Sequence, residues 1–258
     1  MVALAGKPSF VRLDAAKVST TPAQVIEVLE REGGVIIENL ISQELAQQIK
    51  TDLKPHFDGD TPDKYGFFPE TTQRASGLLG ISDACVELAL GFRVNPGGRQ
   101  QVLHRDDNDY HPSDKKLPVM IGCVTALTKT TKENGATIAI PRSHLWDPER
   151  RPLDEEAIPA ELEPGDALIF LGNTYHAGGA NITENDYRET VGIFLCQPTL
   201  RPAENQFLMI PLERVRQLKP QAQRLLGYGL CEPGVGFMNY SDPMRVLFGV
   251  EDEETVNM

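Results

Sequence analysis

Features that mark several large classes of protein are missing from this chain. No stretch approaches the roughly 20 consecutive apolar residues that a membrane-spanning helix needs, so we expect no membrane insertion. There is no internal repeat and no low-complexity segment. The apolar run at the N-terminus is too short, and interrupted too soon, to be a signal peptide. These absences together predict a cytoplasmic protein.

Cysteine and positive charge are both scarce. The four cysteines, at positions 85, 123, 196 and 231, form no C-x-x-C pair, so we expect free thiols and not a disulfide framework. Lys and Arg number 25 against 37 Asp and Glu, which gives a formal net charge of −12. A chain this acidic repels phosphate backbones, so nucleic acid is not an expected partner. No basic patch suits the phosphates of a coenzyme A thioester, which argues against an acyl-CoA substrate.

The first part of the chain carries helix signals. Thr21 is a helix cap followed by Pro22, and the glycine pair beginning at Gly33 ends that helix. Residues 35–37 predict a short buried strand, and Ser42 caps a second helix. Residues 82–90 are expected to be helical as well. Between the helix that Ser42 caps and the expected helix 82–90, residues 56–80 are rich in Gly, Pro, Asp and Thr. This composition is typical of a surface loop or of the wall of a pocket.

The pattern changes to short strands from residue 99 onward. Turn signals such as Pro164-Gly165-Asp166 separate the apolar runs, which favours a β-sandwich or barrel. The 258 residues fit one large β domain or two smaller ones, and length alone does not decide between them. The expected strands are 100–104, 119–127, 137–140, 167–171 and 190–197.

Three residues could bind a metal ion together. His104 and Asp106 are two positions apart, so on a strand both side chains point to the same side. His176 follows the apolar run 167–171 and precedes two glycines that allow close backbone approach. Two histidines and one carboxylate on one face of an ion form the facial site of non-haem Fe(II) oxygenases. An H-x-D tripeptide alone also occurs by chance, and a lone histidine is more often a hydrogen-bonded loop residue.

Arg188 is the fourth candidate. It lies twelve residues after His176, where it could form a bidentate pair with the carboxylate of an acidic co-substrate. The simpler alternative is a surface ion pair with Glu184, Asp186 or Glu189. A zinc hydrolase whose metal is bound by two histidines and one aspartate is a further alternative for the metal cluster, although such an enzyme has no use for a buried arginine.

These residues and their surroundings resemble the phytanoyl-CoA dioxygenase family of Fe(II)- and 2-oxoglutarate-dependent dioxygenases, and within it the fungal enzymes that modify meroterpenoids and alkaloids. The resemblance runs from the first helix to about Gly229. The spacing of the motifs taken together is specific, whereas no single motif is. The strings that carry it are Gln101-Val102-Leu103-His104-Arg105-Asp106-Asp107, Glu133-Asn134-Gly135-Ala136-Thr137, Arg142-Ser143-His144, Pro164-Gly165-Asp166 and His176-Ala177-Gly178-Gly179-Ala180-Asn181.

The resemblance implies a mainly β fold with flanking helices around a double-stranded β-helix, the jelly-roll core that cupins share. It implies that Fe(II) is bound by His104, Asp106 and His176, with 2-oxoglutarate and O2 as co-substrates. Arg188 matches the arginine that pairs with the distal carboxylate of 2-oxoglutarate. Related halogenases lack the carboxylate ligand, so an aspartate there favours hydroxylation, desaturation or rearrangement. Two further positions, Gln101 and Thr137, match residues that help hold 2-oxoglutarate, whereas His144 matches a structural turn and His111 a residue near the metal.

The resemblance implies a small, hydrophobic substrate, with a polycyclic fungal meroterpenoid first among the candidates. Alternatives are an oxygenase acting on an alkaloid or acyl substrate, and a non-catalytic cupin-like binding protein. The candidate pocket residues are Tyr65, Phe67, Phe68, Val124 and Phe194.

The family resemblance also implies how the chain is divided. We expect one domain over residues 1–258, with mostly helical support and a pocket loop over 1–98. The β-helix core is expected over 99–200, and a helical, lid-forming segment over 201–258. A homodimer is expected. The chain departs from the family at Leu90-Gly91, where the family usually has more residues, so either this member is shortened or a segment is omitted.

Overall fold

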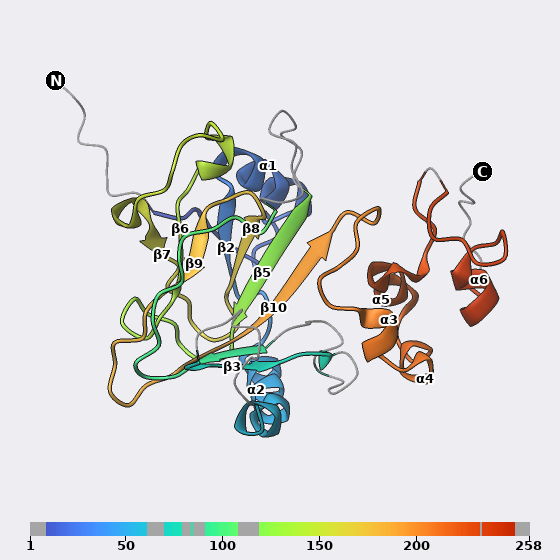
Figure 1. Ribbon diagram of the computed structural model, residues 1–258, viewed down its shortest axis with the longest axis horizontal. Coiled ribbons are helices and arrows are strands. Elements are labelled where there is room, and N and C mark those ends of the chain that lie inside the picture. Colours follow the sequence, from blue (N-terminus) through green and yellow to red (C-terminus); the bar gives the residue numbers. More distant parts are fainter. Residues whose placement is uncertain are drawn as a thin grey trace. The chain divides into compact units, whose positions relative to one another are not determined.

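The computed structural model describes residues 9–60, 70–78, 84, 91–107, 119–232 and 234–250. The chain forms two compact units, drawn in Figure 1. The first, here called the core unit, contains Met1–Ser76 and Leu90–Leu195, and the second, the C-terminal unit, contains Gly77–Ala89 and Cys196–Met258. The single domain expected over residues 1–258 therefore stays a prediction.

The core unit is built on two sheets. The larger has seven strands in the order β1-β2-β8-β5-β10-β4-β3. Strands β1 and β2 are parallel, whereas β2 with β8, β8 with β5, β10 with β4 and β4 with β3 are antiparallel. The smaller has the order β7-β6-β9. The strands of the larger sheet are β1 (Arg12–Asp14), β2 (Gly34–Glu38), β3 (Thr72–Ala75), β4 (Gly91–Val94), β5 (Met120–Ala126), β8 (Ala167–Leu171) and β10 (Arg188–Cys196). Those of the smaller sheet are β6 (Thr137–Ala139), β7 (Ile158–Pro159) and β9 (His176–Gly178). The expected mainly β fold with a jelly-roll core is confirmed.

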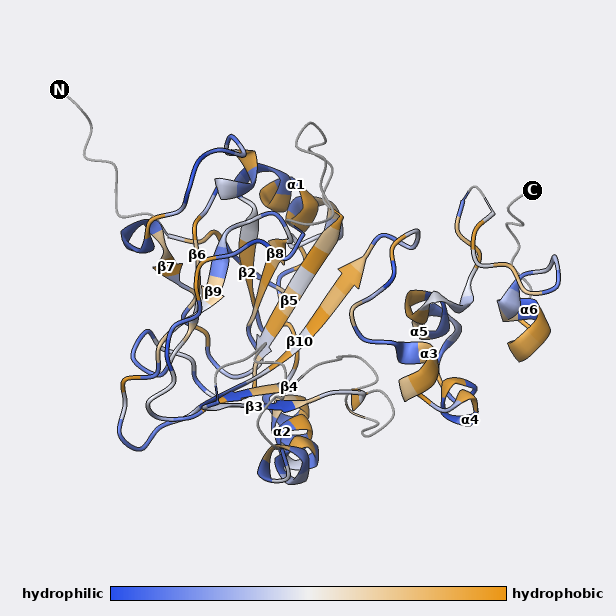
Figure 2. Cartoon of the chain, viewed as in Figure 1, coloured by the Kyte–Doolittle hydropathy of each residue, from blue (hydrophilic) through white to orange (hydrophobic). Residues whose placement is uncertain are grey.

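Alternating side chains on the central strands build apolar layers on both faces of the larger sheet. On β8, Leu168 and Phe170 join an inner cluster with Ile36 and Val124. Ile169 and Leu171, which alternate with these residues along β8, pack in an outer cluster with Val28 and Leu29 of helix α1. Each large side chain that is fully buried in this way stabilises the fold by about 1.5–3 kcal/mol. Burial on both faces explains why β8 is continuously apolar, and Figure 2 also shows orange along much of β10.

Two helices flank the larger sheet. Helix α1 (Pro22–Glu32) begins after Thr21, whose side chain accepts a hydrogen bond from the Gln24 amide, and ends at Gly33. Gly33 has a φ of +78°, and a Cβ there would lie 2.4 Å from the ring of His144 and 2.6 Å from the hydroxyl of Thr174. Helix α2 (Gln43–Asp58) is capped by Ser42 and contacts β3 and β4. Both helix starts expected from the sequence are confirmed.

The strand expectations are confirmed with one exception. The structure has strands at β5, β6, β8 and β10, and β2 covers the expected run 35–37. Residues 100–104 do not form a regular strand. Only His104 makes a bridge, to His176, and Gln101 adds one backbone hydrogen bond to Gly178. This segment pairs with β9, which is only three residues long, so a longer ladder has no partner.

The C-terminal unit contains short helices around a small apolar cluster. Ile210, Val215, Leu218 and Leu226 are its buried members. The helices are α3 (Gln206–Met209), α4 (Leu212–Val215), α5 (Pro220–Gln223) and α6 (Pro243–Phe248), with an irregular turn over Arg224–Tyr228. The helical, lid-forming segment expected over 201–258 stays a prediction, although its described part contains these short helices. The expected helix 82–90 lies outside the described residues, except for residue 84.

The described residues also bear on membrane-spanning helices and on the cysteines. No helix among them is both long and apolar enough to cross a membrane. Cys123, Cys196 and Cys231 are free thiols, as expected, and Cys85 lies outside the described part of the chain.

Candidate metal and co-substrate site

The candidate metal ligands come from two backbone segments that pair with each other. His104 and His176 exchange both backbone hydrogen bonds, each 2.9 Å long, across an antiparallel bridge. Directly opposed residues in such a pair carry their side chains on the same side. The two imidazole rings are accordingly 4.6 Å apart between centroids. The sequence separation of 72 residues is thus closed by β pairing.

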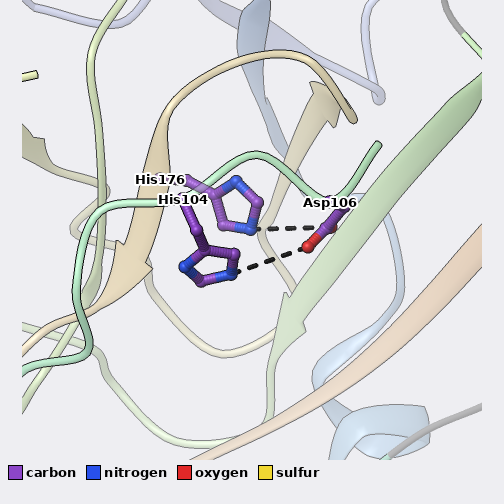
Figure 3. Close-up of side chains that lie close together, drawn as sticks. All are labelled: His104, Asp106 and His176. Carbon is purple, nitrogen blue, oxygen red and sulfur yellow. Dashed lines mark ion pairs between the residues drawn. The ribbon is translucent and has the colours of Figure 1, made fainter. Parts of the chain in front are cut away.

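Asp106 completes the cluster, as Figure 3 shows. One carboxylate oxygen lies 3.6 Å from Nε2 of His104, and the other lies 3.6 Å from Nε2 of His176. The backbone amide of Asp106 donates to the carbonyl of Gly172, which holds the turn after His104 against the end of β8. One ligand atom from each of the three residues lies within 4.8 Å of the others. The structure therefore brings together all three residues that the sequence singled out.

Hydrogen bonds to the backbone orient both histidine rings. Nδ1 of His104 lies 2.8 Å from the carbonyl of Val102, and Nδ1 of His176 lies 3.0 Å from that of Thr174. A carbonyl only accepts, so each Nδ1 carries the proton, and each Nε2 presents a lone pair toward Asp106. This is the usual arrangement of metal-binding histidines, in which the second ring nitrogen is tied to a carbonyl or carboxylate.

The surroundings of His176 favour its neutral form. Burial lowers the pKa of this imidazole, and neighbouring His104 lowers it further, although Asp106 opposes them. The ring of Phe170 packs against that of His176 with centroids 4.4 Å apart. Metal ligation requires a neutral imidazole. Two neutral imidazoles and one carboxylate fit a divalent ion such as Fe(II), and three protein ligands leave positions open for other groups.

Arg188 is buried without a matching negative charge among the described residues. Only 5% of the residue is exposed, and burial alone lowers the pKa of its guanidinium to about 10. Its Nη1 donates to the hydroxyl of Thr137 at 3.2 Å, and its Nε has no hydrogen-bond partner among the described residues. The simpler alternative of a surface ion pair is wrong, because Arg188 is buried and forms no ion pair with any described residue, whereas Glu189 pairs with Arg93.

Hydrogen bonds and strand pairing link Arg188 to the metal cluster. Its partner Thr137 lies in β6, opposite Gly178 of β9, and Gly178 is two residues from His176. The Gly178 amide donates to Oε1 of Gln101 at 2.8 Å. Gln101, Thr137 and Arg188, all expected to hold the co-substrate, therefore lie on adjoining segments. Because Arg188 belongs to the larger sheet and Thr137 to the smaller one, their hydrogen bond crosses from one sheet to the other.

The candidate pocket residues have mixed outcomes. Val124 is buried in the inner cluster, and Phe194 packs against the same cluster, with its ring 6.4 Å from that of Phe170. Their contact with a substrate stays a prediction. Tyr65, Phe67, Phe68 and His111 lie outside the described residues. His144 is structural as expected, with its Nε2 3.0 Å from the carbonyl of Glu30.

Two neighbours of the site, Phe170 and Thr190, were not among the candidate residues. Phe170 contacts His176, and the alternation of the run 167–171 could have placed it on the inner face with Leu168. Thr190 is two positions after Arg188 on the same strand, so it shares that face. Its hydroxyl is buried and has no hydrogen-bond partner among the described residues, which makes it available to a ligand near Arg188.

Comparison with known proteins identifies similar chains in fungi. Residues 80–190 match the model of the phytanoyl-CoA dioxygenase family. The dioxygenase swnH1 of Metarhizium robertsii is 33% identical, with 93% of this chain and 92% of the relative aligned. The dioxygenase peniF of Penicillium patulum is 31% identical, with 93% and 94% aligned. The first alignment spans 289 positions, more than this chain's 258 residues, so the relative has residues without a counterpart here.

Solved structures share the fold at low sequence identity. The non-haem α-ketoglutarate-dependent carbocyclase SnoK from nogalamycin biosynthesis aligns with a TM-score of 0.53 at 15% identity, covering 68% of this chain and 83% of SnoK. HygX from Streptomyces hygroscopicus, solved with nickel and 2-oxoglutarate bound, aligns with a TM-score of 0.53 at 16% identity, covering 68% and 87%.

Proposed function

Because the chain belongs to the phytanoyl-CoA dioxygenase family of Fe(II)- and 2-oxoglutarate-dependent enzymes, we propose that His104, Asp106 and His176 hold its Fe(II). Arg188 binds the distal carboxylate of 2-oxoglutarate, supported by Thr137, and Gln101 lies beside them. The protein is a dioxygenase, so the alternatives of a non-catalytic binding protein and of a zinc hydrolase do not fit the family.

One observation carries the residue assignment. A cluster of three ligands is joined, through Gly178 and Thr137, to a buried arginine that has no carboxylate partner among the described residues. A buried cation without a counter-ion is costly, and an anionic ligand offsets that cost. A dicarboxylate that reaches from the metal to Arg188 satisfies both halves of the site at once.

The roles of the side chains follow from their chemistry. Bound Fe(II), with 2-oxoglutarate and O2, supplies an oxidant able to break a substrate C–H bond, while 2-oxoglutarate becomes succinate and CO2. Arg188 anchors and orients the co-substrate. Thr190 donates a second hydrogen bond to the same carboxylate. Phe170 and Phe194 supply an apolar wall that excludes water from the side of His176.

The proposed substrate is a small, hydrophobic, polycyclic fungal metabolite, with a meroterpenoid first among the candidates and an alkaloid second. Its oxidation is a hydroxylation, a desaturation or a rearrangement. Fungal dioxygenases are the similar curated proteins, and the aromatic wall beside His176 suits an apolar ring system. The acidic charge of the chain disfavours a phosphate-bearing substrate. Incubating the enzyme with candidate compounds and following succinate release by mass spectrometry tests the class.

Anaerobic titration tests the site itself. Fe(II) followed by 2-oxoglutarate is expected to give a visible charge-transfer band in the parent protein and none in Asp106→Ala. A parent protein that develops no band, together with unchanged binding in Asp106→Ala, contradicts the assignment.

The compartment and the oligomeric state belong to the same proposal. The enzyme acts in the cytoplasm, where free thiols such as Cys196 stay reduced. It works as a homodimer. Light scattering tests this, since a single chain has a mass of 28.5 kDa and a dimer has twice that mass.

A further inference from the structure

A turn that carries no metal ligand contacts both segments that do. Ser143 begins the short 3-10 turn η3 (Ser143–Leu145) and is completely buried. Its hydroxyl accepts a hydrogen bond of 2.8 Å from the backbone amide of Tyr175, the residue just before His176. Its carbonyl accepts a hydrogen bond of 2.8 Å from Nη2 of Arg105, the residue between His104 and Asp106. One residue thus contacts both ligand segments.

The same two segments meet a second time beside this turn. The guanidinium of Arg105 lies over the ring of Tyr175, with its central carbon 4.2 Å from the ring centroid. Its Nε is buried and finds no hydrogen-bond partner in the described part of the chain, so the stacking on Tyr175 takes the place of one. The side chains adjacent to the ligands therefore form a closed triangle of Ser143, Arg105 and Tyr175.

The turn itself is fixed to the end of helix α1. Arg142 has a φ of +65°, a left-handed conformation that a residue with a side chain adopts only at a cost. Its backbone amide donates to the carbonyl of Glu32 at 2.7 Å, and its guanidinium donates twice to the Glu32 carboxylate, at 2.7 and 2.9 Å. The hydroxyl of Thr174 donates to the carbonyl of Gly33 at 2.8 Å. Several hydrogen bonds to the end of α1 thus fix the position of Ser143.

We propose that Ser143 is a positioning residue for the metal centre. By holding Tyr175 and Arg105 together, it sets the spacing between His176 on one side and the pair His104 and Asp106 on the other. This role rests on the proposed metal site. Metal affinity is sensitive to such supporting contacts, whose removal typically weakens binding about 10–100-fold.

Anaerobic titration with Co(II), a visible stand-in for Fe(II), tests the proposal without turnover. Ser143→Ala removes the acceptor of the Tyr175 amide and is expected to weaken Co(II) binding about tenfold or more and to alter its visible spectrum. Ser42→Ala is the matched control, because the Ser42 hydroxyl also accepts a backbone amide, that of Leu45, at the start of α2. The control is expected to bind Co(II) as the parent does.

A second variant keeps the test decisive if Ser143→Ala does not fold. Arg105→Met removes the hydrogen bond to Ser143 at a half-buried position that tolerates substitution better. It is expected to weaken Co(II) binding as well, about tenfold. A folded Ser143→Ala protein, or a folded Arg105→Met protein in its place, that binds Co(II) with parental affinity and spectrum overturns the positioning role. Failure of the parent protein to bind Co(II), by contrast, overturns the metal site itself.

Discussion

At the scale of single residues, Arg188 shows how a functional side chain costs stability. It is fully charged, buried and without a carboxylate partner among the described residues. A residue selected for folding alone would not combine those properties, because desolvating an unpaired charge is unfavourable. The cost is offset only when an anion arrives.

Arg188→Met is therefore expected to separate stability from binding. Without 2-oxoglutarate the variant melts at the parental temperature or above, because an unpaired buried charge has been removed. The dissociation constant for 2-oxoglutarate rises at least about 30-fold, since one partner of a buried ion pair is lost. Thermal melts with and without 2-oxoglutarate measure both effects.

Arg31→Met serves as the control for this variant, because Arg31 is half-exposed and pairs with Glu27 and Glu32. It should keep the rise in melting temperature that 2-oxoglutarate gives the parent. A large loss of stability in Arg188→Met without ligand would show that the arginine has a partner in the free protein.

Glu32 predicts a specific acid sensitivity. Hydrogen bonds from Arg142, with a smaller contribution from Arg31, lower the pKa of its carboxyl from the ordinary 4.5 to about 2. In this range the unfolded chain binds the proton and the folded chain does not, so the stabilisation present above pH 4.5 is lost as the pH falls toward 2. Glu32→Gln is expected to be less stable than the parent near neutral pH, and the difference should shrink as the pH falls through the folded-state pKa of about 2.

Urea unfolding at a series of pH values measures this difference. Glu27→Gln, which alters a mostly exposed carboxylate of the same helix, is the control and should differ little from the parent at any pH. A constant gap between the parent and Glu32→Gln across the range contradicts the role given to the Arg142 pair.

At the scale of elements, strand β10 has different chemistry on its two faces. Arg188 and Thr190 share the face proposed to bind the co-substrate, whereas Glu189 lies on the opposite face and is fully buried. Glu189 accepts from Nε of Arg93 on neighbouring β4 at 2.7 Å, and Lys50 of α2 lies 3.5 Å away. The guanidinium of Arg93 also contacts the ring of Phe57 on α2. This ion pair fixes the strand that carries the co-substrate arginine.

Glu189→Gln is expected to lower the free energy of unfolding by about 3 kcal/mol, because it leaves the buried Arg93 incompletely paired. Glu163→Gln, at the exposed pair with Lys129, is the control and should cost less than about 1 kcal/mol. Urea denaturation measures both variants. Equal effects at the two sites would show that burial adds nothing to the Arg93 pair.

The elements also show where local sequence signals suffice. Helices α1 and α2 begin where their caps predict, and α1 ends where its glycine predicts, because a cap satisfies the amides of its own helix and needs no distant partner. The segment 100–104 was expected to be a strand and is not, because its ladder depends on the three residues of β9 opposite it. Strand pairing is a property of two segments, and only one of them is visible in a local window.

At the scale of the whole molecule, the residues proposed to bind the metal and the co-substrate all belong to the core unit. A chain that ends at residue 200 is therefore expected to bind Co(II) and 2-oxoglutarate within about twofold of the full chain, since it keeps every residue proposed to bind them. Substrate oxidation is expected to be lost, because the proposed lid over 201–258 is absent. Co(II) titration and a succinate assay separate the two outcomes, with circular dichroism as the check on folding. Loss of Co(II) binding in a folded truncated chain contradicts this division of roles.

The sequence by itself determined which chemistry to expect of this protein. His104, Asp106, His176 and Arg188 favoured a metal ion with an acidic co-substrate, and the family resemblance carried by the surrounding motifs named Fe(II) and 2-oxoglutarate. Only the tertiary structure decided that Arg188 is buried without a carboxylate partner among the described residues and that Ser143 joins the two ligand segments. Burial and hydrogen bonding between residues tens of positions apart depend on how the two sheets face each other, and no local pattern of residues records that.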